Sequence, residues 1–297
     1  TGAILDSLAA RFPHVTALHG DEAPPAGWNG KSYACQRLAD RAQGEWLLFT
    51  DADTLHVPDS IAQGIAQASG LRADLLSAFP RQITRTWAER ALVSFIMDFL
   101  PLVGADLSAL WRGEGGATVA NGQYLLARAD TYRAAGGHRA IAEALVDDFA
   151  LMQQFRARGQ RVALVDGTSM LSCRMYEDAR AVWDGFSKNI LLGLETSATT
   201  PRGWWWAPLF AWGYASVFVV PFYRLVFERR RWLALVEIGW LGALRGAVTW
   251  RLKRPWAEIA ATPLAAWSVM ALGLSALLRR QHQGRVVWKG RAYRLTR

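Results

Sequence analysis

The segment from Gly44 to Thr54, with the sequence Gly-Glu-Trp-Leu-Leu-Phe-Thr-Asp-Ala-Asp-Thr, decides the fold of this chain. Its residues 46–50 are apolar or favour β structure, and we expect a buried strand, central in a parallel sheet. Asp51 and Asp53 follow the strand directly. Ligands gather at the carboxyl ends of such strands, and two carboxylates one residue apart can hold a hard divalent cation that binds a diphosphate in turn. The alternative is a strand closed by an Asx turn.

The composition narrows the range of partners. The chain has 297 residues, a formal net charge of +9 and two cysteines, Cys35 and Cys173. The charge fits nucleic acid, an anionic membrane surface or a phosphorylated substrate. The basic residues cluster beside apolar runs and not along a groove studded with aromatic residues, so we expect no nucleic-acid partner. The cysteines lack the spacing of metal ligands, and their small number predicts a reducing compartment.

A turn-rich loop before the strand has the features of an anion site. It runs from Pro24 to Lys31 and leads into a predicted helix over residues 32–43. Gly30 lets the backbone approach a ligand closely, and Lys31 stands at the helix start, where backbone N–H groups attract anions. The alternative is a solvated turn with an ordinary surface lysine.

A second acidic pair, Asp147 and Asp148, opens a predicted helix that runs to about Arg158. The helix dipole alone favours acids at this position. In the functional interpretation one of them is a general base, because adjacent like charges raise one pKa. Further along, Arg174 and Lys188 could contact phosphate, although each taken singly has the pattern of a surface charge.

Beyond residue 200 the composition becomes that of a membrane protein. Residues 205–223 and 259–278 are uncharged and close to the roughly 20 residues that span a bilayer. The segment between them, residues 232–250, contains Glu237 and Arg245, and we expect it to lie at the interface with both side chains reaching water. The protein would then be a multi-pass protein of the cell (inner) membrane with a cytoplasmic catalytic half. The alternative is a buried helix pair in a soluble protein.

Taken together, three motifs resemble those of the family 2 glycosyltransferases, inverting enzymes of the GT-A fold. They are Gly27-Trp28-Asn29-Gly30-Lys31, Asp51-Ala52-Asp53 and Val146-Asp147-Asp148, in this order. Three further segments are similar to the membrane-bound branch that includes carotenoid- and hopanoid-associated enzymes: Cys173–Tyr176, Gly185–Asn189 and Trp288–Arg291.

The resemblance implies an α/β fold with a GT-A-type mixed sheet flanked by helices over residues 1–200. The family's first strand, with its nucleotide loop, has no counterpart here, so we expect this catalytic domain to be N-terminally incomplete. Residues 201–297 would form transmembrane or interfacial helices with a basic cytoplasmic tail.

The resemblance also implies roles for individual residues. The donor site of a nucleotide sugar would consist of Lys31, Gly30, Asp51, Asp53, Arg174 and Lys188. Asp53 would act most directly, through Mn²⁺ or Mg²⁺ on the diphosphate. Asp148 would be the base that deprotonates the acceptor hydroxyl, and Asp147 stands where the family often has Glu.

The implied reaction is hexosyl transfer, of the EC 2.4 type, to a hydroxyl of a lipid-type acceptor at the membrane, such as a carotenoid or hopanoid. The Gln-x-x-Arg-Trp motif of the family is absent, which argues against a processive polysaccharide synthase. Two alternatives remain. One is a transferase that uses a polyprenyl phosphate acceptor, and the other is a catalytically inactive membrane module that binds a nucleotide.

Overall fold

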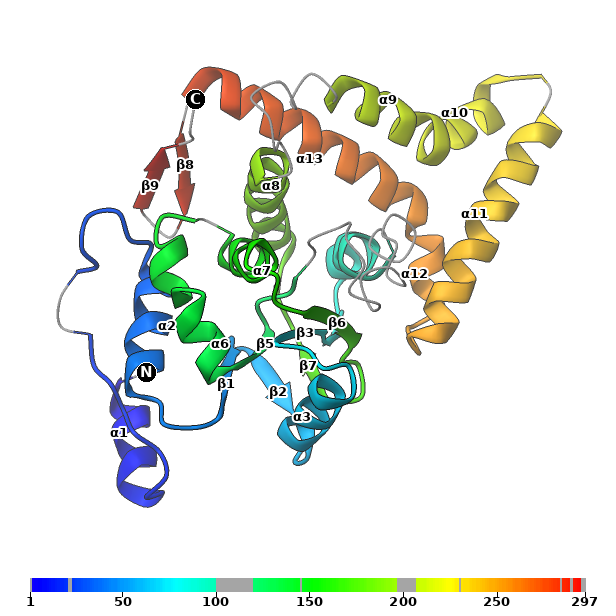
Figure 1. Cartoon of the computed structure of the whole chain (residues 1–297). Coiled ribbons are helices and arrows are strands. Elements are labelled where there is room, and N and C mark those ends of the chain that lie inside the picture. The colour runs from blue at the N-terminus through cyan, green and yellow to red at the C-terminus, as the bar shows by residue number, and fades with distance from the viewer. Residues whose placement is uncertain are drawn as a thin grey trace. The chain divides into compact units, whose positions relative to one another are not determined.

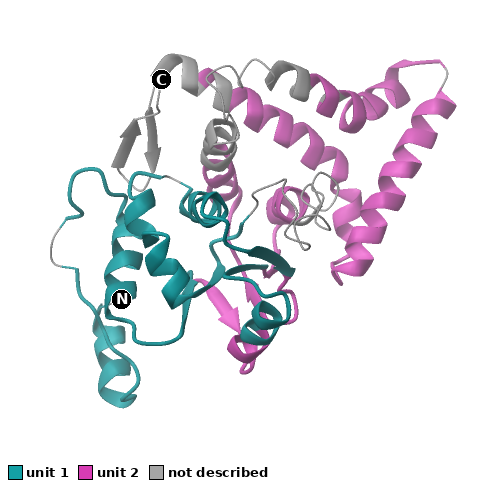
Figure 2. Cartoon of the chain, in the orientation of Figure 1, with its two compact units in different colours: residues 1–51, 64–78, 118–165 teal, residues 52–63, 79–117, 166–297 magenta. Residues whose placement is uncertain are grey.

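The structure, a computed structural model, divides into two compact units that interleave along the chain (Figure 2). It describes residues 2–20, 23–99, 120–144, 146–196, 207–229, 231–283, 285–288 and 291–294. Unit 1 consists of residues 1–51, 64–78 and 118–165, and unit 2 of residues 52–63, 79–117 and 166–297. The division into a catalytic part, 1–200, and a membrane part, 201–297, stays a prediction about function.

Unit 1 is built on a four-stranded sheet with the order β1-β5-β3-β6 (Figure 1). The strands are β1 (Trp46–Thr50), β5 (Tyr124–Arg128), β3 (Leu75–Phe79) and β6 (Val162–Asp166). β5 pairs antiparallel with both β1 and β3. The expectation of a central strand in a parallel sheet is therefore wrong for β1, which is the terminal strand in this order. A short apolar run fits parallel and antiparallel pairing equally well, so its composition could not distinguish them.

The helices of this part of the chain are α1 (Gly2–Arg11), α2 (Gly30–Arg41), α3 (Ser60–Gly70), α6 (Ala129–Ala134), the 3₁₀ helix η2 (Gly137–Ile141) and α7 (Asp147–Ala157). Of these, α2, α6, η2 and α7 supply buried side chains to the core of unit 1, whereas no residue of α1 is buried. The core side chains include Leu75, Leu125, Tyr132, Leu151 and Phe155, all fully buried. α2 and α7 begin close to the residues where the sequence predicted helices, because both starts are marked by local signals.

Unit 2 contains a three-stranded sheet with the order β2-β7-β4. Its strands are β2 (Thr54–His56), β7 (Leu171–Cys173) and β4 (Arg81–Gln82). The π-helix η1 (Glu89–Phe99) and helix α8 (Ala179–Thr196) follow β4 and β7. η1 packs through Leu92 and Val93 against Val182 and Phe186 of α8. Together with the sheet of unit 1, this confirms the predicted architecture of mixed sheets flanked by helices.

The rest of unit 2 is helical: α9 (Ala207–Phe218), α10 (Val220–Phe227), α11 (Arg231–Arg251), α12 (Ala257–Ala260) and α13 (Thr262–Gln283), followed by the hairpin β8 (Arg285–Trp288) and β9 (Arg291–Arg294). The predicted first span is not continuous, because the helix breaks at Val219 and restarts with Pro221 in the first turn of α10. Within the described part of the chain, one helix, α11, is long and apolar enough to cross a membrane. It is the segment that we expected at the interface.

Arg245 in the middle of α11 does not reach water, which corrects a second expectation. Its side chain is 1% exposed, and it donates a hydrogen bond of 3.1 Å to the carbonyl of Ser94. The Glu258 carboxylate lies 3.8 Å away and binds Arg254 at 2.9 Å. Glu237 does reach the surface, where it pairs with Arg224 at 2.9 Å. A buried carboxylate, and not solvent, thus accompanies the charge of Arg245.

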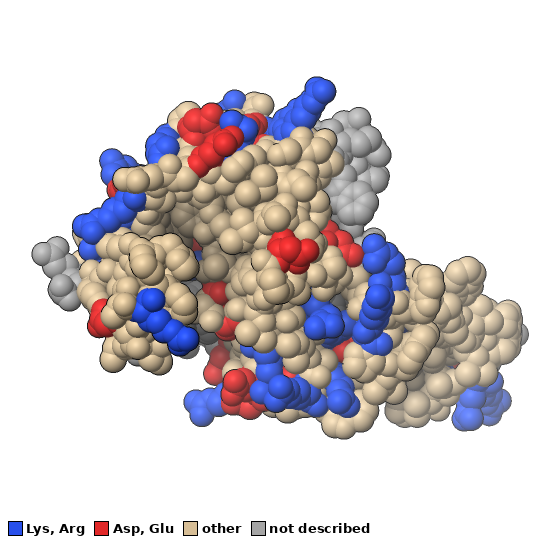
Figure 3. All heavy atoms as spheres, turned by 90° about the horizontal axis from the view of Figure 1, so that it is seen from below, with Lys and Arg blue, Asp and Glu red and all other residues tan. Residues whose placement is uncertain are grey.

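Charged side chains are interspersed on the face of the molecule that Figure 3 shows. Lys and Arg alternate there with Asp and Glu, and wide uncharged areas lie between them. The positive net charge is therefore not gathered into a continuous basic strip on this face.

Candidate active site

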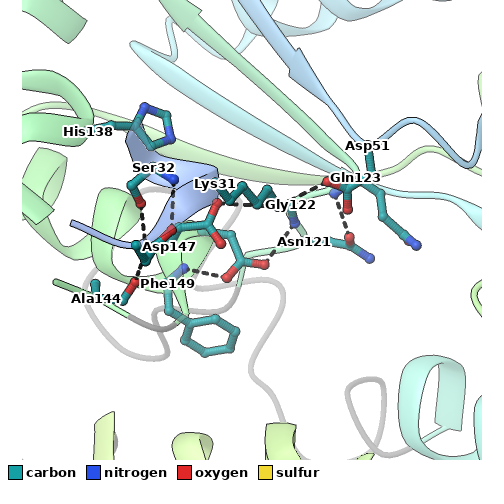
Figure 4. Close-up of polar contacts among 12 residues, drawn as sticks. Lys31, Ser32, Asp51, Asn121, Gly122, Gln123, His138, Ala144, Asp147 and Phe149 are labelled. Carbon is teal, nitrogen blue, oxygen red and sulfur yellow. Dashed lines mark hydrogen bonds and ion pairs between the residues drawn. The ribbon is translucent and has the colours of Figure 1, made fainter. Parts of the chain in front are cut away.

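Lys31 joins two acids that are far apart in the sequence (Figure 4). Its Nζ lies 3.0 Å from Oδ1 of Asp51 and 3.3 Å from Oδ2 of Asp147. α2 begins at Gly30, with Asn29 as its N-cap, so Lys31 occupies the first turn of the helix. The structure thereby brings three predicted site residues from three different elements to one place in unit 1.

The end of β1 holds Asp51 in position. Thr50, the last residue of β1, pairs with Tyr124 at the start of β5. Its hydroxyl donates a hydrogen bond of 3.0 Å to the carbonyl of Gln123. This fastens the end of the strand to the turn of residues 121–123, and Asp51 follows at once with its side chain partly exposed. Asp51 is therefore accessible to a ligand while its backbone is fixed.

Asp148 is held by two backbone N–H groups. Its Oδ2 accepts a hydrogen bond of 2.8 Å from Gly122, and its Oδ1 accepts one of 2.9 Å from Phe149. Gly122 comes close because it has no side chain. A Cβ there would lie 3.1 Å from Nζ of Lys31 and 3.3 Å from Oδ2 of Asp148. No role was predicted for Gly122, whose signal in the sequence is an Asn-Gly turn before an apolar run.

The charges of this cluster shift its pKa values in opposite directions. Burial raises the pKa of Asp148 to about 6, and the neighbouring carboxylate of Asp147 contributes; Lys31 and the two N–H donors oppose the rise. Burial would lower the pKa of Lys31, but Asp147 and Asp51 outweigh it and raise the pKa. Near neutral pH the cluster therefore contains a permanent ammonium group and a carboxylate suited to accept a proton.

His138 is a buried, uncharged side chain close to Asp147 and Lys31. Its Nδ1 lies 2.8 Å from the hydroxyl of Tyr132. Burial lowers the pKa of His138 to about 4, although Asp147 raises it, and Lys31 lowers it further. The imidazole thus stays neutral at physiological pH. No sequence pattern distinguished this histidine, because its burial depends on the packing of η2 against Phe49.

The other predicted donor residues belong to unit 2. Asp53 is exposed and immediately precedes β2. Arg174 Nη2 lies 2.8 Å from Oε1 of the fully buried Glu89, which also accepts a hydrogen bond from the backbone N–H of Arg85. Arg174 is thus engaged by a carboxylate in this structure. Lys188 falls within α8, but its side chain lies outside the described residues.

A metal centre made by the protein alone is not found in the described part of the chain. No group of three or more His, Cys, Asp or Glu side chains lies close enough there to hold an ion.

Comparison with known proteins assigns the family. The chain is 25% identical over 178 residues to the 4,4'-diaponeurosporenoate glycosyltransferases of Staphylococcus aureus strains MRSA252 and USA300, which is 59% of this chain and 46% of each relative. The chain thus spans about half the length of these curated relatives. A crystal structure of TarS 1–349 from the same species in complex with UDP-GlcNAc matches 96% of this chain and 82% of that chain, at 12% identity and a TM-score of 0.40.

The motifs resembled those of family 2, whereas the family model that matches is a different one, also of glycosyltransferases. It covers residues 2–297, nearly the whole sequence. The chain therefore belongs to glycosyl transferase family 21.

Proposed function

We propose that this chain carries the transfer site of an inverting hexosyltransferase, which moves a sugar from a nucleotide-sugar donor to a hydroxyl of a lipid-type acceptor. One observation carries the proposal: Lys31 holds Asp51 and Asp147 at 3.0 and 3.3 Å, directly beside Asp148. A cation, a donor-side acid and a candidate base thus lie together. The GT-A fold and the family 2 chemistry belong to the same proposal.

The donor side consists of Lys31, Gly30 and Asp51, joined by Asp53 of the same motif. Lys31 is positioned to neutralise phosphate charge, and the N–H groups of the first turn of α2 attract anions as well. Arg174 and Lys188, which belong to unit 2, stay in the proposed donor set only because the resemblance of the motifs predicts it. In such a site the protein contributes positioning and charge stabilisation for the leaving group.

Asp148 takes the proton in the proposed mechanism. The acceptor oxygen attacks the anomeric carbon from the face opposite the diphosphate, and a new carbon–oxygen bond forms. The bond to the diphosphate breaks, and its electron pair leaves with the nucleoside diphosphate. The hydroxyl proton passes to the carboxylate of Asp148. The rise of the pKa of Asp148 to about 6 keeps this group a base at neutral pH while increasing its proton affinity.

A divalent cation, Mn²⁺ or Mg²⁺, fits the residues present. Asp51 and Asp53 offer hard carboxylate oxygens, and Asp51 is partly exposed at the end of β1. Mg²⁺ is commonly held by one or two carboxylates together with substrate phosphates, so a pair of acids is sufficient. When bound, the ion would neutralise charge on the leaving diphosphate.

Features of unit 2 support a lipid acceptor and a membrane location. α11 has the length and composition of a spanning helix, and large apolar side chains are exposed along α10 and α11, among them Phe227, Trp232, Trp240 and Trp250. A cavity of about 720 Å³, within the usual range for ligand pockets of roughly 300–1,000 Å³, is lined mostly by apolar residues of α9, α10 and α11, together with Ser216 and Glu237. The relatives from Staphylococcus are named for a carotenoid acid. We infer a multi-pass protein of the cell (inner) membrane.

The test uses membranes that contain the full gene product and compares Asp148→Asn with the wild type. We expect Asp148→Asn to lower transfer by about 10²–10⁴-fold, the usual contribution of a general base, while calorimetry shows unchanged binding of the nucleotide sugar. Asp40→Asn, an exposed carboxylate of α2, is the matched control and should keep full activity. Turnover at the wild-type rate in Asp148→Asn would remove Asp148 as the base.

Product analysis separates the remaining alternatives. A glycosylated polyprenyl phosphate would replace the carotenoid or hopanoid acceptor in the proposal. Nucleotide-sugar binding without transfer or hydrolysis by the wild type would favour the inactive membrane module. No binding of any nucleotide sugar would contradict the donor site itself.

A further inference from the structure

Asn29 makes more contacts than the cap of a helix requires. It is buried and precedes α2 in an extended conformation. Its Oδ1 accepts a hydrogen bond of 2.8 Å from the backbone N–H of Ser32. Its Nδ2 donates one of 2.8 Å to the Ser32 hydroxyl and another to the carbonyl of Ala144, while its backbone N–H donates one of 2.8 Å to the carbonyl of Ala142.

Only one of these bonds is needed to cap α2. Any side chain with an acceptor can bond the first free N–H groups, and Ser, Thr and Asp do this about as well as Asn. The bond from Nδ2 to Ala144 needs a donor that projects past the cap, which an Asn amide provides and an Asp carboxylate does not. It joins residues that are 115 positions apart in the sequence.

The segment that Asn29 binds leads directly into the acidic pair. Ala144 lies three residues before Asp147, and Lys31 lies two residues after Asn29. The same two segments meet a second time where Lys31 Nζ lies 3.3 Å from Oδ2 of Asp147. Gly27 approaches the same segment, because a Cβ there would lie 3.2 Å from Oε1 of Glu143. The loop that contains Asn29 and Lys31 is thus linked to Ala142 and Ala144 by hydrogen bonds and to Asp147 by an ion pair.

We propose that Asn29 is a positioning residue for glycosyl transfer, whose side-chain amide sets the separation between the donor-binding Lys31 and the base-bearing start of α7. The proposal rests on the proposed function. Asn29 touches neither donor nor acceptor. It acts through Ala144 and through the first turn of α2, so that a donor held by Lys31 and Asp51 faces Asp148 at the reactive distance. A displacement of about 1 Å at such a site can cost about 10²-fold in rate.

Three variants separate positioning from capping. Asn29→Ser keeps a capping acceptor but is too short to reach Ala144. Asn29→Asp keeps the shape and the acceptor but has no N–H to donate. Asn29→Ala loses the cap and the bond to Ala144 together. Steady-state transfer in membranes, with donor concentration varied, gives kcat and the donor KM, and thermal unfolding of the purified protein gives Tm.

We expect Asn29→Ser and Asn29→Asp to lower kcat by about ten- to a hundredfold, with the donor KM within about threefold of the wild type. Asn29→Ser should keep most of the Tm that Asn29→Ala loses, because its cap is intact. If Asn29→Ser and Asn29→Asp keep the wild-type kcat, Asn29 is a cap alone and the proposal is wrong. A fall in kcat that follows Tm through all three variants would also overturn it.

The outcome is distinct from failure of the proposed function. If the wild type binds no nucleotide sugar or transfers none, the proposed function fails before any variant is compared. If the wild type transfers sugar and the variants do as well, only the role of Asn29 is contradicted. A loss of donor binding in Asn29→Ser, measured by calorimetry, would place Asn29 in the donor site and contradict its role as a positioning residue.

Discussion

The cluster around Lys31 in unit 1 and the network around Glu258 in unit 2 contain the same kinds of charge in opposite surroundings. In unit 1 the side chains of Lys31 and Asp51 are 44% and 36% exposed, and Lys31 is shared between two acids. In unit 2 the side chains of Arg245 and Glu258 are each 1% exposed. An exposed cluster can exchange a protein partner for a ligand, whereas a buried network is fixed by the cost of exposing it. The candidate site thus differs from this buried network in the exposure of its ammonium group and of one of its acids, Asp51.

The buried network gives the largest expected effect on stability. Glu258→Ala removes the carboxylate that Arg254 holds at 2.9 Å and that faces Arg245. Removal of one member of a buried ion pair costs about 3–5 kcal/mol, because the remaining charge stays desolvated. We expect a large fall in Tm, or aggregation, measured by thermal unfolding in detergent.

Glu258→Gln is the matched control for this prediction. Its amide keeps the hydrogen bond from the hydroxyl of Thr84, which Glu258 accepts at 3.0 Å. We expect it to lose less stability than Glu258→Ala, and the folded fraction of either variant should keep its binding of the nucleotide sugar. A wild-type Tm in Glu258→Ala would show that the network is not structural.

The cluster around Lys31 gives a smaller expected effect, which is a shift in the pH dependence of sugar transfer. Asp148 acts as a base only when it is deprotonated, so kcat should fall as the pH drops through about 6. The positive charge of Lys31 lowers the pKa of Asp148. Lys31→Met removes this effect, and the pKa of Asp148 should rise, which moves the acid limb of the pH profile to higher pH.

Lys31→Arg tests whether the shift arises from charge. It keeps the positive charge, and its acid limb should stay close to that of the wild type, although the different geometry of Arg weakens donor binding. An acid limb at the same pH in Lys31→Met and in the wild type would show that Asp148 does not titrate in the rate-limiting step, or that Lys31 does not act on it.

Much of the fold is encoded in local sequence signals. The apolar run of β1, the acids at the start of α7 and the turn before α2 each lie within one short segment, and each element begins within a few residues of its predicted start. The resemblance of the motifs predicted functional roles for Lys31, Asp51 and Asp147, but it did not predict the ion pairs that Lys31 makes with both acids. No local pattern contained these pairs, because the residues belong to separate elements.

The features of the fold and of the candidate site that were not predicted depend on contacts between residues that are far apart in the sequence. β1 pairs antiparallel with β5, which lies more than 70 residues further on. The N–H of Gly122 reaches Asp148 across 26 positions, and Asn29 reaches Ala144 across 115. Arg245 was expected in water because a charge in an apolar helix usually reaches it, but Ser94 lies 151 positions away and meets it in the core. Tertiary packing decided each of these cases.

The smallest expected effect comes from the exposed ion pair of unit 2. Arg224 binds Glu237 at 2.9 Å, with side chains that are 23% and 42% exposed. Pairs of this kind contribute only about 0–1 kcal/mol, because water solvates both charges when the pair is broken. Glu237→Gln should therefore leave Tm in detergent nearly unchanged, at high and at low salt. Since Glu237 and Glu258 both face arginines in the same unit, a loss as large as that of Glu258→Ala would show that burial is not what distinguishes the two pairs.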